Sequence, residues 1–181
     1  MAKQIVLLRG VNVGAKGQRI AMANLRAFAL RLGFTEAQTL LQSGNLVVTG
    51  DKASGAALET LLENEASSRL GLTIDFLVRT PKAWRAMIEQ NPYPEAAKDD
   101  PSHLLVFFLK AAPTPDAVEN LRASIKGCET LQVVGAHAYV AYPDGIGESK
   151  LTNVVIQRGL GARGTGRNWN TVQKLAALAG A

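Results

Sequence analysis

The chain has 181 residues, 47% of them hydrophobic, with a formal net charge of +5 and one cysteine. No stretch of eighteen uninterrupted apolar residues occurs, and the start MAKQIVLLRG lacks the apolar core of a secretory signal, so the sequence argues against a membrane protein and predicts a cytoplasmic one. Cys128 alone excludes an internal disulfide and cannot by itself complete a tetrahedral zinc site.

Positive charge is concentrated at the two ends of the chain. The first 35 residues contain six cations and no acid, and residues 148–181 contain five cations and one acid, so the ends carry +6 and +4 and the middle carries −5. Both ends therefore suit an anionic partner, either a nucleic acid or a phosphorylated small molecule. The alternative is that these cations are ordinary solvent-exposed charges on the outer faces of helices.

The first eighty residues predict strands and helices in the order βαββαβ. An apolar run that ends at Arg9-Gly10 is typical of a buried strand, and Ser43-Gly44-Asn45 predicts a tight hairpin turn. The expected elements are a strand at 4–8, a helix at 22–32, a hairpin at 39–49, a helix at 54–70 and a strand at 73–78.

The second half predicts the same order after a connector. Pro81 opens a helical stretch, and Asn91-Pro92-Tyr93-Pro94 ends it before an acidic segment that reaches Pro101. The elements expected next are a strand at 104–109, a helix at 115–125, strands at 130–134 and 138–142, a helix at 151–158, a strand near 162–167 and a last amphipathic helix.

These patterns predict an α+β protein with two tandem ferredoxin-like (βαββαβ) plait subdomains, each an antiparallel sheet backed by two helices. We expect the first ferredoxin-like subdomain at residues 1–80, a helical connector at 81–100, and the second ferredoxin-like subdomain with the C-terminal helix at 101–181. No residue identity relates the halves, so the repeat is one of element order. Nothing in the pattern specifies an oligomeric state.

A glycine-rich loop follows the first predicted strand, at Gly10 to Gly17. Strand, glycine loop and helix is the order that phosphate-binding loops use. The spacing does not fit a Walker motif, because three residues separate Gly10 from Gly14 and Ala15-Lys16-Gly17 follows. The loop is therefore a candidate anion site without a nucleotide signature.

A second candidate region lies near the C-terminus. Gly161 to Arg167 alternates small residues with arginines, and on a strand its glycines would expose backbone N–H groups to an anion. Asn170 and Gln173 approximate a capping box, which predicts a helix start beside Arg167 and a buried Trp169. Neither histidine has metal-ligand spacing, so no metal site is predicted.

Four blocks of the sequence resemble the signature blocks of a bacterial domain-of-unknown-function family, number sixteen ninety-seven. They are LLRGVNVG at 7–14, LQSGN at 41–45, PDGIGESKLTN at 143–153 and GRNWNTV at 166–172. The resemblance implies two plait-like α+β subdomains and brings no assigned activity, substrate or catalytic residue. The family usually has a second glycine at the position of Ala15, and Thr or Ala at the positions of Gly164 and Gly166.

The leading hypothesis is a binding protein for an anionic ligand, without a cofactor. Its candidate binding residues are Arg9, Asn12, Lys16, Ser43, Asn45, Lys150, Arg167, Asn168 and Asn170. We expect the two basic ends to share one cleft. One alternative is an enzyme that uses the same polar loop residues, although no general base is evident. Another is a structural or interaction protein in which these residues form turns and caps.

Overall fold

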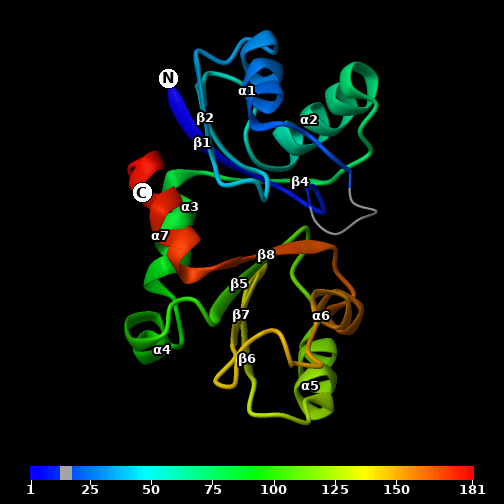
Figure 1. Cartoon of the computed structure of the whole chain (residues 1–181), viewed down its shortest axis with the longest axis vertical. Helices are drawn as coiled ribbons and strands as arrows, with labels where there is room; N and C mark the ends of the chain where they lie inside the picture. The colour runs from blue at the N-terminus through cyan, green and yellow to red at the C-terminus, as the bar shows by residue number, and fades with distance from the viewer. Residues whose placement is uncertain (13–17) are drawn as a thin grey trace. The chain divides into compact units, whose positions relative to one another are not determined.

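The computed structural model describes residues 1–12 and 18–181 (Figure 1). It confirms the predicted mixed α+β class, with two four-stranded antiparallel sheets and seven helices among the described residues. The chain forms two compact units: one comprises Met1–Ala86 with Leu175–Ala181, and the other comprises Met87–Lys174. None of the described helices combines the length and hydropathy that a bilayer span requires.

The first unit contains one sheet with the strand order β2-β3-β1-β4. Central β1 pairs antiparallel with β3 on one side and β4 on the other. The elements are β1 (Ala2–Leu8), α1 (Met22–Arg31), β2 (Glu36–Leu40), β3 (Asn45–Gly50), α2 (Gly55–Leu70) and β4 (Phe76–Arg79), followed by α3 (Pro81–Glu89).

The second unit repeats this arrangement with the order β6-β7-β5-β8. Its central strand β5 pairs antiparallel with β7 and β8. The elements are α4 (Pro94–Asp99), β5 (Leu104–Leu109), α5 (Pro115–Ser124), β6 (Thr130–Val134), β7 (His137–Ala141), α6 (Asn153–Leu160) and β8 (Gly164–Asn168), followed by α7 (Trp169–Ala179).

Each sheet buries an apolar core against its two long helices. In the first unit Val6 and Leu8 of β1 pack with Phe28 of α1 and Leu62 of α2. Ile5 and Leu7, on the opposite face of β1, are equally buried. The strand is therefore apolar on both faces, which explains why its sequence is a continuous apolar run without the alternation of a half-exposed strand.

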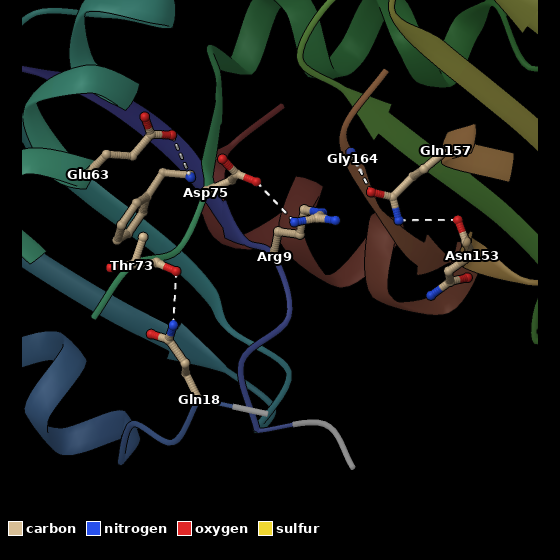
Figure 2. Close-up of polar contacts among 9 residues, drawn as sticks. Arg9, Gln18, Glu63, Thr73, Asp75, Asn153, Gln157 and Gly164 are labelled. Atoms are coloured by element: carbon tan, nitrogen blue, oxygen red, sulfur yellow. Dashed lines mark hydrogen bonds and ion pairs between the residues drawn. The ribbon is translucent and has the colours of Figure 1, made fainter. Parts of the chain in front are cut away.

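Side chains from the helices cover the backbone of the edge strands. In the first unit the α2 carboxylates accept N–H groups of edge strand β4: Glu63 from Phe76 at 3.0 Å and Glu59 from Val78 at 2.8 Å. Gln157 of α6 does the same for β8, accepting from Gly164 N–H at 3.2 Å (Figure 2). These bonds satisfy edge-strand groups that would otherwise be open to another strand.

Several predicted boundaries were wrong. The helical connector expected at 81–100 contains two helices, because α4 follows the stop at Asn91-Pro92-Tyr93-Pro94 with Pro94 in its first turn, where proline is tolerated. β2 begins three residues before the predicted hairpin, at Glu36. The helix expected from 151 begins at Asn153 and is capped by Thr152. Helix α7 begins at Trp169, because Asn168 rather than Asn170 caps it.

Trp169 is 5% exposed, which confirms the prediction that it is buried. We expect Trp169→Ala to lower the free energy of unfolding by about 3–5 kcal/mol, the range for losing a large buried aromatic side chain. Lys174→Ala, at an exposed position of the same helix, is the control. Urea denaturation monitored by far-UV circular dichroism would measure both, and a loss below about 1 kcal/mol for the tryptophan variant would contradict a packing role.

Glu59 accepts the Val78 N–H and lies 3.6 Å from the Arg79 guanidinium, whose pKa is lowered because burial disfavours its charge. Glu59→Ala removes this acceptor and this carboxylate from a buried site, so we expect a loss of about 2–4 kcal/mol of unfolding free energy. Glu65→Ala breaks the exposed Glu65–Arg69 pair on the same helix and should cost less than about 1 kcal/mol. Equal losses in denaturant titrations of the two variants would contradict the role given to Glu59.

Candidate functional site

Asn12 is a candidate binding residue whose side chain serves the fold. Its Nδ2 donates to the carbonyls of Ile20 at 2.8 Å and Gln42 at 2.9 Å, and its Oδ1 accepts from Ile20 N–H at 3.0 Å. Its φ is +55°, a left-handed conformation that asparagine tolerates better than most residues. Asn12 therefore ties the loop after β1 to the hairpin turn.

The hairpin turn packs directly against the end of β1. A Cβ atom on Gly44 would lie 2.5 Å from Val11 Cγ2 and 2.8 Å from Leu8 Cβ, so only glycine fits. Leu8 N–H donates to the Gly44 carbonyl at 2.8 Å. Asn45 is fully buried and donates to the Leu40 carbonyl at 2.7 Å and to Ser43 Oγ at 3.1 Å. Residues of the blocks at 7–14 and 41–45 therefore pack against each other, and the contacts between them stabilise the fold.

Arg9, the candidate cation near the amino terminus that the structure describes, is paired with a carboxylate of the fold. Arg9 Nη1 forms an ion pair with Asp75 Oδ2 at 3.1 Å (Figure 2). Gln18, at the far end of the glycine-rich loop, donates to the Thr73 carbonyl at 2.9 Å. Lys16 lies outside the described residues.

The carboxy-terminal candidates are also built into the fold. Asn168 Oδ1 accepts from Thr171 N–H at 3.0 Å and caps α7. Arg167 is 7% exposed and donates to Thr165 Oγ1 at 2.7 Å and to the Gly166 carbonyl at 2.8 Å. Burial lowers the pKa of its guanidinium to about 10. Asn170 is exposed in the first turn of α7.

A cavity of about 330 Å³ lies in the second unit and includes Lys150, the remaining candidate. It is formed by the loop that follows α5, the loop that follows β7, and the first turn of α6. The lining residues are Ser124, Ile125, Lys126, Gly127, Cys128, Glu129, Asp144, Gly145, Glu148, Ser149, Lys150, Leu151 and Val155.

The register of the β6–β7 hairpin explains why these two loops meet. Thr130, the first residue of β6, pairs with Ala141, the last residue of β7. The segment before Thr130 and the segment after Ala141 therefore leave the same end of the hairpin. Tyr142 fixes the second segment further, because its buried hydroxyl donates to the Leu151 carbonyl at 2.9 Å.

Two of the three cavity carboxylates have partners on the neighbouring loop. Ser149 hydroxyl donates to Glu129, and this bond lowers the pKa of the Glu129 carboxyl. The Cys128 thiol hydrogen-bonds to Asp144; this bond and the nearby negative charge raise the pKa of the thiol. Cys128 is exposed, and the raised pKa makes its thiol a poorer nucleophile, because the thiolate is the reactive form.

Three charged side chains of the cavity are not used by the fold. Lys126, Glu148 and Lys150 form no side-chain hydrogen bond or ion pair with any described residue, and all three are exposed. Among the candidate residues that the structure describes, Lys150 differs in this respect from Asn12, Asn45 and Asn168, whose side chains are held by the fold. The cavity is thus a place where charged groups from two loops face open space.

Sequence reasoning placed Lys150 at a site but missed the residues opposite it. Lys126, Cys128 and Glu129 lie after a helix with no motif around them, and a single cysteine in a sequence bears only on disulfide and zinc chemistry. Asp144 and Glu148 lay inside a recognised block, between a strand and a helix, which is where sites are commonly built. Among the residues described, no group of three or more His, Cys, Asp or Glu is placed to hold a metal ion.

The family description "Protein of unknown function (DUF1697)" matches residues 1–139 of the chain. The chain belongs to this family. The match ends before the blocks at 143–153 and 166–172, so the whole of the cavity's second loop lies beyond it. No curated protein matches the chain.

A solved structure resembles the whole chain. It is described as the structure of conserved bacterial protein SP0830 from Streptococcus pneumoniae, and it is 22% identical, with a TM-score of 0.76, over 98% of each chain. At this level of identity the likeness shows a shared fold only. That fold extends over the carboxy-terminal residues that the family match leaves out.

Cys128 is the only cysteine in the sequence, so thiol labelling reports on one position. Asp144 raises the pKa of this thiol, so Asp144→Asn should lower that pKa and increase the thiolate fraction at fixed pH. We expect the variant to react faster with N-ethylmaleimide near neutral pH, and its rate to reach the plateau at lower pH. A pH–rate profile measures this, with Asp99→Asn on α4 as the control. Unchanged profiles would contradict the Asp144–Cys128 contact.

Proposed function

We propose that the protein binds a small anionic ligand in the cavity of the second unit. The observation that carries the proposal is the pair Lys126 and Lys150, which line one cavity from two different loops and have no partner among the described residues. Ammonium groups that face a shared cavity supply hydrogen-bond donors and positive charge to one ligand. The carboxylates Glu129 and Asp144 already have neighbours on the opposite loop.

The size and charge of the cavity favour a small ligand over a nucleic acid. Its volume of about 330 Å³ is at the lower end of the roughly 300–1,000 Å³ range of small-molecule pockets. Two lysines line it with three carboxylates, so the lining has one negative charge in excess. A nucleic acid would need a continuous basic surface, and a net charge of +5 for the whole chain does not provide one at this site.

The enzyme alternative receives less support from the same geometry. Asp144 raises the pKa of the thiol that lines the cavity. Neither histidine lines the cavity, and His103 Nδ1 lies 2.6 Å from Asp100 Oδ2 instead. Activation of a cysteine nucleophile normally requires a nearby base or cation that lowers the thiol pKa.

The finer structural predictions are proposals as well. We propose that each unit is a ferredoxin-like plait, which is supported by the antiparallel order β2-β3-β1-β4 and its counterpart β6-β7-β5-β8. Three further expectations stay predictions. They are the division of the chain into subdomains at residues 80 and 100, a cytoplasmic location, and a cleft shared by the two basic ends.

Ligand binding can be tested at the cavity itself through Cys128. A panel of small anions, including inorganic phosphate, sulfate, acetate, hexanoate and hexyl phosphate, would be assayed for protection of Cys128 from N-ethylmaleimide and by isothermal titration calorimetry. We expect at least one anion to protect the thiol, and Lys150→Met to weaken that anion's binding by about tenfold or more, since a charged hydrogen bond contributes about 1.5–3 kcal/mol.

Lys98→Met is the matched control, because it removes the same charge from an exposed position of α4 outside the cavity. This variant should bind within about twofold of the unmodified protein. Equal weakening in both lysine variants would indicate a nonspecific effect of net charge. Absence of protection by every anion in the panel would refute the proposal.

A further inference from the structure

The same cavity presents an apolar surface next to its lysines. Ile125, Leu151 and Val155 line it, and Val155 in the first turn of α6 keeps 39% of its surface exposed. Of the six exposed large hydrophobic residues in the described part of the chain, Val155 lies in the lining. An exposed apolar side chain at a cavity is typical of a binding surface.

The apolar residues and the lysines come from the same two loops. Ile125 immediately precedes Lys126, and Leu151 immediately follows Lys150. The first loop therefore offers the cavity an ammonium group and an apolar side chain in succession, and the second offers Lys150, whereas Leu151 is 5% exposed and packs in the core. Such a lining complements a ligand with an anionic end and an apolar body. The apolar body leaves water, and the anionic end accepts hydrogen bonds from the two lysine ammonium groups.

The charges of the cavity limit how much negative charge the ligand carries. The lining already has one excess negative charge, and Glu148 has no partner among the described residues that would offset it. A second negative charge on the ligand would add repulsion from three carboxylates in a partly enclosed space. A singly charged carboxylate fits this balance better than a phosphate monoester, which carries nearly two charges at neutral pH.

We infer that the ligand of this cavity is a small monocarboxylate with an apolar chain, whose carboxylate binds Lys126 and Lys150 and whose chain contacts Ile125 and Val155. The inference rests on the proposed function and narrows it to one chemical class. It departs from the sequence-based expectation of a phosphorylated molecule or nucleic acid, because that expectation came from the charge of the chain ends and not from the charge of the cavity.

The test compares acetate, butanoate, hexanoate and octanoate with hexyl phosphate by calorimetry and by protection of Cys128. Each added methylene that enters the cavity should tighten binding by about fourfold until the apolar surface is covered. Hexanoate should bind more tightly than hexyl phosphate. Glu148→Gln should tighten hexanoate binding and Lys150→Met should weaken it, because one removes a like charge and the other an opposite charge.

Val155→Thr is nearly isosteric and should reduce the dependence on chain length while leaving acetate binding unchanged. Val154→Thr is the matched control, because Val154 is 63% exposed and lies outside the lining. Affinity independent of chain length, or tighter binding of hexyl phosphate than of hexanoate, would overturn the inference and leave the anion site intact. Binding of none of these anions would refute the proposed function itself.

Discussion

The central strand of each sheet is hydrogen-bonded on both sides, and this pairing continues past the end of the strand. Leu8 N–H donates to the Gly44 carbonyl in one hairpin turn, and Leu109 N–H donates to the Ala136 carbonyl in the other. The backbone N–H of the next residue in each unit also donates to a carbonyl: Arg9 N–H to Asp75, just before β4, and Lys110 N–H to Arg163, just before β8. The two units therefore share one backbone plan although their side chains differ, because backbone groups must be satisfied whatever the sequence.

This constraint explains which polar residues are occupied by the fold and which face the cavity. Loops that end a central strand must satisfy their own N–H and C=O groups, and Asn12 and Asn45 supply the missing donors and acceptors. The cavity loops follow β7 and precede β6 instead, at the other end of the hairpin. Their backbone is held by Ser149 and Tyr142, and the side chains of Lys126, Glu148 and Lys150 form no hydrogen bond or ion pair with a described residue.

The local charge of the cavity differs in sign from the charge of the chain. A net charge of +5 favours an anionic partner, yet the cavity lining contains more carboxylates than lysines. Two of those carboxylates have a partner on the neighbouring loop. The Ser149 hydroxyl lowers the pKa of Glu129, and Asp144 raises the pKa of the Cys128 thiol. Selectivity at such a site depends on the charges within a few ångströms, since exposed charges farther than about 10 Å are largely screened by salt.

The sequence by itself determined the α+β class, the order of strands and helices and the burial of Trp169, because hydrophobic periodicity and turn residues act over short stretches of chain. It did not reveal β2 or α4 accurately, since neither contains a fully buried residue that would produce a pattern. It assigned the cap of α7 to Asn170, whereas the pairing of Asn168 with Leu105 ends β8 there and leaves Asn168 to cap the helix. The cavity was decided only by tertiary structure: the β6–β7 register brings Lys126 and Lys150 together from loops 24 residues apart, and no local pattern encodes that pairing.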